Sequence, residues 1–151
     1  MPGHADGHIC LLRDGVLVAG DHVLPRISPA IALFPEARPD PLGDYLESLQ
    51  RTIELAPRLA LPGHGEPILD PAGRAAELLE HHRLRLIETE AALGARPQSG
   101  FELSLALFGG ELEPIQRRFA VGETLSHLER LVREGRAARG VDGGLLTYTA
   151  L

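Results

Sequence analysis

Residues 2–9 of the chain read PGHADGHI, a loop that carries two histidines and leads into an apolar segment. His4 and His8 each follow a glycine directly, and glycine lets the backbone bend closely around a ligand. A glycine next to a polar side chain recurs at residues 20–21, which read GD, and at residues 63–65, which read GHG. The elements around these three loops therefore decide how the chain folds.

Short strands and helices alternate around the three loops. Residues 9–12 and 16–19 are apolar and flank an Asp-Gly turn, which predicts a β-hairpin. Apolar side chains at spacings of three and four predict one amphipathic helix over residues 41–56 and another over residues 71–93. Between these helices, residues 58–61 predict a strand that ends at a proline and leads into the GHG loop. This order of elements is typical of an α/β fold.

A change of pattern near residues 94–98 predicts a first domain over residues 1–96 and a second over residues 97–151. In the second domain the sequence predicts a wing of two strands after three short helices, from Ser99 to Phe108, from 114 to 119 and from 123 to 134. Three helices and a wing are the outline of a small winged-helix-like domain.

The composition is that of a globular chain, and it limits the partners to be expected. The 151 residues include 21 acidic side chains and 15 basic ones, all of them arginine, for a net charge of −6. We expect no nucleic-acid partner, because a chain-wide binding surface for nucleic acid needs a basic balance. No apolar stretch approaches the roughly 18 residues of a membrane span, and the first residues do not have the pattern of a signal peptide. The expected location is the cytoplasm, without membrane contact.

His4, His8, Asp21, His22 and His64 lie in or beside the three loops and have side chains that suit a metal ion. Neutral imidazole nitrogens and carboxylate oxygens are common ligands of Zn²⁺, and a carboxylate can also bridge two ions. Loops at the ends of strands can converge on a cation without distorting the sheet. The ligand types predict zinc first, with iron or manganese next.

The series Pro-Gly-His-x-x-Gly-His, Gly-Asp and Pro-Gly-His-Gly resembles the second half of the metallo-β-lactamase superfamily. The similarity is to hydrolases related to glyoxalase II and to members with a winged-helix-like C-terminal segment. It implies the C-terminal half of an αββα sandwich over residues 1–96. It also implies that His4 binds one metal ion, Asp21 bridges two and His64 binds the other. His8 matches a position whose side chain does not bind the metal but supports the ligand loop by hydrogen bonding. No residue matches a further catalytic role.

For the intact parent the resemblance implies a hydrolase of a small-molecule substrate. Two zinc-like ions would activate water for attack on an ester, thioester, lactam or phosphodiester. The superfamily's other ligand cluster, His-x-His-x-Asp-His, does not occur in these 151 residues. We therefore expect a truncated chain that binds zinc weakly or not at all and is inactive by itself. The sheet face and edge exposed by the missing half favour a homodimer or another self-association.

A second hypothesis is a binding or regulatory module, with residues 97–151 as the working part and residues 1–96 as a dimerisation platform. Its basis is a stripe of arginines around the last expected helix, at positions 130, 133, 136 and 139. Residues 97–151 contain six arginines and seven acidic residues. This near-neutral balance argues against direct recognition of a DNA groove.

Overall fold

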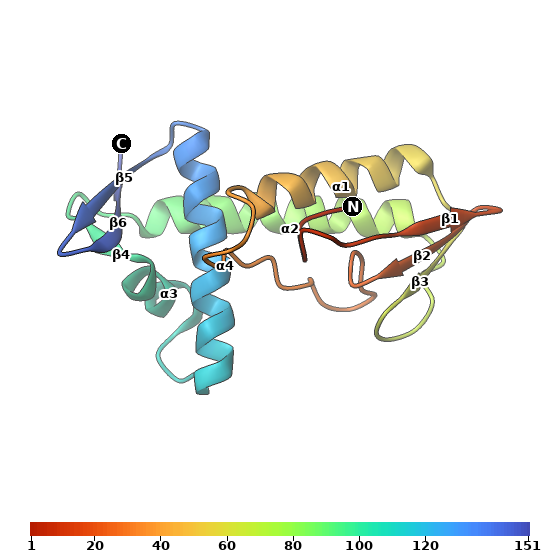
Figure 1. The fold of residues 1–151 in the computed structure, drawn as a ribbon, viewed down its shortest axis with the longest axis horizontal. Coiled ribbons are helices and arrows are strands. Elements are labelled where there is room, and N and C mark those ends of the chain that lie inside the picture. Colours follow the sequence, from red (N-terminus) through yellow and green to blue (C-terminus); the bar gives the residue numbers. More distant parts are fainter. The chain divides into compact units, whose positions relative to one another are not determined.

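The computed structural model describes residues 1–151 and contains four helices and six strands (Figure 1). The chain forms two compact units. Unit 1 consists of residues 1–31 and 41–82, and unit 2 of residues 32–40 and 83–151. The structure thus divides the chain differently from the sequence-based boundary at residues 94–98.

Two local features explain that difference. Helix α2 (Pro71–Ala92) is continuous, so its last turns belong to unit 2 without any break in the helix. In addition, the backbone N–H of Leu33 donates to the carbonyl of Gly122 over 2.9 Å. This bond joins the segment 32–40 to the C-terminal part of the chain, although the two are far apart in sequence.

Unit 1 contains a three-stranded sheet in the order β1-β2-β3, formed by β1 (Leu11–Arg13), β2 (Val16–Gly20) and β3 (Leu59–Pro62). β1 and β2 are antiparallel, whereas β2 and β3 are parallel. The turn between β1 and β2 has φ values of 50° at Asp14 and 73° at Gly15. Two positive φ values are the signature of a type I′ hairpin turn. The predicted hairpin and the predicted third strand are confirmed.

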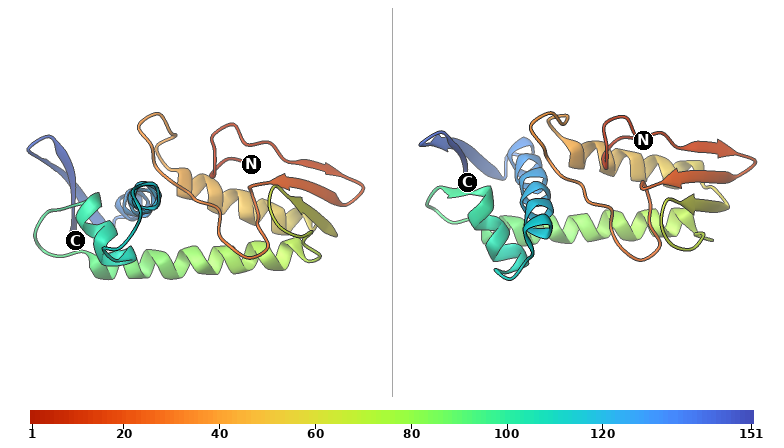
Figure 2. Two further views of the ribbon diagram at one scale, coloured as in Figure 1. Left: turned by 90° about the horizontal axis from the view of Figure 1, so that it is seen from below. Right: turned by 60° about the horizontal axis from the view of Figure 1, so that its bottom comes forward.

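Helix α1 (Pro41–Leu55) connects the two parallel strands and runs beside the sheet (Figure 2). The core of unit 1 combines small and branched side chains from both helices and from β2 and β3. Its fully buried members include Leu17, Ala19, Leu42, Leu49, Ala60 and Ala75. Both helices begin close to their predicted positions, because a proline stands at the first helical residue of each.

Helix α1 also buries a row of polar side chains, Tyr45, Ser48 and Thr52, which we call the polar seam. The hydroxyl of Tyr45 donates to the carbonyl of His22 over 2.9 Å, and the hydroxyl of Ser48 donates to the carbonyl of Pro2, also over 2.9 Å. Thr52 contacts the His22 ring, with 2.8 Å between Oγ1 and Nε2. The polar seam therefore fixes two of the three loops that carry the predicted site residues, the loops of His4 and Asp21.

Unit 2 contains helices α3 and α4 and a second sheet in the order β4-β6-β5 (Figure 2). Its elements are β4 (Gln98–Ser99), α3 (Gly100–Phe108), α4 (Pro114–Arg133), β5 (Ala137–Asp142) and β6 (Leu145–Ala150). Ser99 caps α3 and forms a reciprocal capping box with Glu102. The predicted start of this helix and the predicted two-stranded wing are confirmed.

The prediction of two separate helices over residues 114–134 is wrong, because α4 is one continuous helix. Gly122 falls between the two predicted helices and lies within α4. A Cβ atom at this position would lie 2.8 Å from Cβ of Ala32. The glycine is needed for close approach of the segment 32–40. Residues 97–151 therefore hold two helices instead of three, and a winged-helix-like domain stays a prediction.

The two longest helices are α2, with 22 residues, and α4, with 20 residues. Their length would suffice for a membrane span. Both carry charged side chains along their whole course. None of the four helices combines the length and the apolar composition needed to cross a membrane.

Candidate functional site

Three loops of unit 1 bring His4, Asp21 and His64 together. Nε2 of His4 lies 3.7 Å from Oδ2 of Asp21. Nε2 of His64 lies 3.6 Å from Oδ1 of the same carboxylate. One imidazole thus faces each oxygen of Asp21, and the three side chains singled out in the sequence form one cluster.

The parallel pairing of β2 and β3 explains why Asp21 and His64 meet. Both residues follow the carboxyl ends of their strands, and in a parallel pair these ends lie at the same edge of the sheet. The backbone N–H of Gly63 donates to the carbonyl of Gly20 over 2.8 Å, which extends the contact between strands into the loops. Gly20 has a φ of 52°, and this left-handed turn directs the chain into Asp21.

His4 is held by its other ring nitrogen. Its Nδ1 lies 2.9 Å from the carbonyl oxygen of Ala30. A carbonyl only accepts, so Nδ1 carries the proton and Nε2 presents its lone pair toward Asp21. The preceding Gly3 has a φ of 132°, and a Cβ there would lie 2.5 Å from Cβ of Tyr45. Only glycine allows the loop to pass this close to α1.

The carboxylate of Asp21 has the features of a cation ligand. Its Oδ1 is buried and has no hydrogen-bond partner. The 3.6 Å to Nε2 of His64 is too long for a hydrogen bond. Buried oxygens without a partner are rare, and a cation is one means of satisfying them. The donor set of two imidazoles and one carboxylate therefore fits a metal ion such as zinc.

The cluster by itself is not a metal site. No group of three or more His, Cys, Asp and Glu side chains in residues 1–151 is placed so that it could hold a metal ion. The two imidazole nitrogens lie 3.7 and 3.6 Å from different oxygens of Asp21. Zinc takes three or four protein ligands. Further ligands are needed for each ion.

His8 contacts the backbone of the Asp21 loop. Its Nε2 accepts the N–H of Asp21 over 3.2 Å. Burial lowers the pKa of His8, and the nearby His4 lowers it further. Both effects favour the neutral imidazole, which is the form that can accept this hydrogen bond. His8 does not itself lie against the carboxylate oxygens in the way that His4 and His64 do.

The four arginines that motivated the second hypothesis all have acidic partners. Arg130 pairs with Asp40 and Glu134, Arg133 with Asp40, Arg136 with Glu90 and Glu134, and Arg139 with Glu129. A phosphate backbone would have to compete with these carboxylates.

Two family models match the chain. The metallo-beta-lactamase superfamily model matches residues 1–64, and the model of the metallo-beta-lactamase-like C-terminal domain matches residues 86–151. Among solved structures, a metallo-beta-lactamase family protein from Thermus thermophilus is 43% identical, with a TM-score of 0.87. The match covers 99% of this chain and 47% of the Thermus chain. The chain belongs to the metallo-β-lactamase superfamily.

Two other superfamily members are similar to nearly the whole of this chain and are also more than twice as long. A beta-lactamase domain protein from Burkholderia ambifaria is 39% identical, with a TM-score of 0.90, over 99% of this chain and 46% of its own. The protein named "Probable metallo-hydrolase YqjP" from Bacillus subtilis strain 168 is 34% identical over 140 residues, which are 89% of this chain and 44% of YqjP. This superfamily chain therefore spans less than half the length of its relatives.

A buried histidine lies next to the cluster, at a position whose residue type suits a metal ion but to which the resemblance gives no role. His22 is 1% exposed, and its Nε2 contacts Thr52 in the polar seam. Burial lowers the pKa of His22 to about 4, so the ring is neutral and acts as a structural support in this superfamily fold. The sequence signal for this role is the row of polar residues at spacings of three and four in α1, which a search for apolar spacing overlooks.

A small pocket of about 180 Å³ lies beside His64, between its loop and residues 24–27. Arg74 fixes the shape of this segment. Its Nε donates to the carbonyl of Leu24 over 2.8 Å, and an Nη donates to the carbonyl of Ile27 over 3.1 Å. The superfamily chain thus has an ordered wall next to one end of the cluster, and α2 provides the residue that holds it.

Proposed function

We propose that His4, Asp21 and His64 are metal ligands of a hydrolase, with Asp21 bridging two zinc ions. The observation that carries this proposal is the arrangement around Asp21, where one imidazole nitrogen faces each carboxylate oxygen at 3.7 and 3.6 Å. A carboxylate flanked in this way suits two cations better than one. Membership of the superfamily and the similarity to YqjP support hydrolysis as the type of reaction.

The contacts around the ligands prepare them for this role. His4 keeps a free Nε2 because Nδ1 is bound to the carbonyl of Ala30. His8 accepts the backbone N–H of Asp21 and so fixes the start of its side chain. Such supporting hydrogen bonds orient metal ligands and raise their affinity. A pair of zinc ions supplies a Lewis acid and lowers the pKa of water from about 15.7 toward about 7.

The substrate expected for the whole protein is a small molecule with an ester, thioester, lactam or phosphodiester bond. In this chain the pocket beside His64 is the region adjacent to the ligands that could contact such a molecule. The chain supplies one histidine and a shared carboxylate for each ion. We therefore propose weak metal binding by this chain alone, and activity only when the remaining ligands are supplied.

Metal titration of the chain is the experiment that tests this proposal. We expect Co²⁺, used as a coloured substitute for Zn²⁺, to give an absorption change that Asp21→Asn abolishes. The matched control is Asp14→Asn, an exposed residue in the β1–β2 turn whose positive φ asparagine tolerates. If Asp21→Asn bound Co²⁺ as the unchanged chain does, the assignment of Asp21 as a shared ligand would be wrong.

A further inference from the structure

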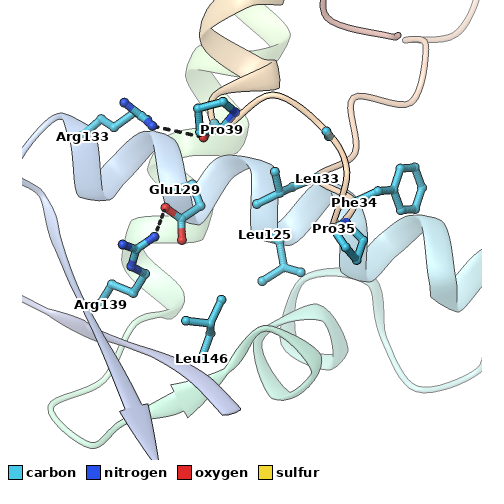
Figure 3. A pocket seen from close by; sticks show the side chains of 10 residues that line it. Leu33, Phe34, Pro35, Pro39, Leu125, Glu129, Arg133, Arg139 and Leu146 are labelled. Atoms are coloured by element: carbon cyan, nitrogen blue, oxygen red, sulfur yellow. Dashed lines mark hydrogen bonds and ion pairs between the residues drawn. The ribbon is translucent and has the colours of Figure 1, made fainter. Parts of the chain in front are cut away.

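Unit 2 has a pocket of its own, which the proposed hydrolase chemistry does not use. Its volume is about 480 Å³, within the range of small-molecule sites. We call it the α4 pocket. One wall is α4, a second is the segment 33–39, and a third comes from the hairpin of β5 and β6 (Figure 3).

The interior of the α4 pocket is apolar. Leu33 and Pro35 come from the segment 33–39, Leu125 from α4 and Leu146 from β6. Figure 3 shows Leu33, Leu125 and Leu146 reaching the pocket from three different elements. Leu146 is 45% exposed, so apolar surface is left open to water. Covering this surface with hydrocarbon is favourable, at about 25 cal/mol for each Å² removed from water.

The polar side chains that line the pocket are two arginines, which donate hydrogen bonds, and one glutamate. Glu129 is the one carboxylate in the lining, and both its oxygens are occupied. Oε1 accepts the hydroxyl of Tyr148 over 2.7 Å, and Oε2 accepts an Nη–H of Arg139 over 2.9 Å. The charge of Glu129 is thus paired with that of Arg139, and its buried oxygens face Tyr148 and Arg139.

Arg133 and Arg139 provide the surplus donors. A guanidinium has five N–H groups. Arg139 uses one nitrogen for Glu129, and its side chain is 50% exposed. Arg133 uses one nitrogen for the carbonyl of Pro39 over 3.4 Å. Its Nε is 3.9 Å from Asp40, whereas Arg130 is closer to the same carboxylate, at 3.2 Å.

We propose that the α4 pocket binds an amphipathic carboxylate, with its hydrocarbon chain on the leucines and its carboxylate at Arg133 and Arg139. Guanidinium groups bind carboxylates through parallel hydrogen bonds, which makes arginine well suited to this contact. Such a ligand contacts the apolar interior with its hydrocarbon chain and accepts hydrogen bonds from the remaining N–H groups of Arg133 and Arg139 with its carboxylate. An uncharged hydrocarbon would leave the donors unused, and a small hydrophilic anion would leave the leucines exposed.

The ligand class is tested by titrating the full chain with three probes, octanoate, octan-1-ol and acetate. Binding is followed by calorimetry and by the methyl NMR signals of Leu125 and Leu146, with EDTA present so that no metal ion contributes. We expect octanoate to bind at least about tenfold more tightly than either other probe, since it alone satisfies both parts of the pocket. Equal binding of octan-1-ol or of acetate would overturn the proposal.

Variants then locate the binding site. Arg133→Gln should weaken octanoate binding about tenfold, the effect of one charge-assisted hydrogen bond. Leu146→Asn should weaken it to a similar degree. Both side chains are partly exposed, so both variants should melt close to the unchanged chain. The matched control is Arg13→Gln in β1, whose side chain is 92% exposed and which should bind octanoate unchanged.

Two results would contradict the assignment. One is that Arg133→Gln binds octanoate as tightly as the control variant. The other is that octanoate binds only after dilution separates a dimer whose interface covers Leu146, because the occupant of the pocket would then be a second copy of the chain. Neither result bears on the metal ligands of unit 1, which the Co²⁺ titration tests separately.

Discussion

Gly63 lies so close to Asp21 that a Cβ atom on residue 63 would be 2.5 Å from Oδ1 of the carboxylate. The glycine before His64 therefore has a second role besides flexibility. It leaves the space that the Asp21 side chain occupies. The sequence motif Gly-His thus couples two of the three proposed ligands through packing.

This relationship predicts that Gly63→Ala weakens metal binding. The new methyl group would displace the Asp21 carboxylate, and we expect the affinity for Co²⁺ to fall about tenfold or more, as for loss of a supporting contact. The matched control is Gly7→Ala, because a Cβ at residue 7 meets no atom within 4 Å. If both variants bound Co²⁺ equally well, displacement of Asp21 would not matter for the metal.

The contact between His8 and the backbone of Asp21 leads to a second prediction. His8→Ala removes the acceptor of the Asp21 N–H, which should cost about 1 kcal/mol of unfolding free energy. The affinity for Co²⁺ should fall about 10–100-fold, because the ligand loses its orientation. Ile9→Ala changes an exposed neighbour, 77% accessible, and should leave the affinity unchanged. Loss of stability with full Co²⁺ affinity in His8→Ala would show that His8 supports only the fold.

Local sequence signals predicted the elements around this site well. Asp14 and Gly15 fix the hairpin through their positive φ values, and Pro41 and Pro71 mark the first residues of α1 and α2. These signals depend on the residue itself and its immediate neighbours. The meeting of Asp21 and His64 follows from strand order, since the parallel strands β2 and β3 end at Gly20 and Pro62. The choice of His4 rests on the resemblance to the superfamily.

Contacts between distant segments were not predictable in the same way. Gly122 lies inside α4, and the space that its missing Cβ leaves is filled by Ala32, a residue 90 positions away in sequence. Tyr45, Ser48 and Thr52 are buried because loop carbonyls and His22 lie opposite them. A pattern of apolar residues along one helix carries no information about such partners.

The buried contact between Tyr148 and Glu129 predicts a strong effect on unit 2. The hydroxyl donates to Oε1 over 2.7 Å, and both side chains are buried. Burial raises the pKa of Tyr148, and Glu129 raises it further, so the hydroxyl stays a donor. Tyr148→Phe should cost about 1.5–3 kcal/mol, the range for a hydrogen bond to a charged group. Thermal unfolding measures this cost, and a change below about 0.5 kcal/mol would contradict it.

The capping box of α3 predicts a dependence of helix stability on pH. Hydrogen bonds from the backbone and the side chain of Ser99 lower the pKa of Glu102 below its ordinary value of 4.5, and Arg96 adds to this effect. A carboxylate with a lowered pKa contributes stability that is fully present above its ordinary pKa and is lost as the pH falls through the lowered value. The protection of the α3 amides against exchange, taken relative to the intrinsic exchange rate at each pH, should therefore fall at low pH. Glu102→Gln should remove much of this pH dependence of protection, and an unchanged profile in the variant would exclude Glu102 as its source.

Because Gly122 lies close to Ala32, we expect Gly122→Ala to destabilise the folded chain, although the same substitution would stabilise an isolated helix. In an exposed helix interior, Gly→Ala stabilises by about 1 kcal/mol. Here the new Cβ would lie 2.8 Å from Cβ of Ala32, closer than real Cβ contacts allow, so the segment 32–40 must move. We expect Gly122→Ala to lower the unfolding free energy by about 1–3 kcal/mol, the typical cost of overpacking. Since Leu33 and Pro35 from this segment line the α4 pocket, octanoate binding should weaken as well. A variant that melts higher and binds octanoate normally would show that the segment is not packed on α4.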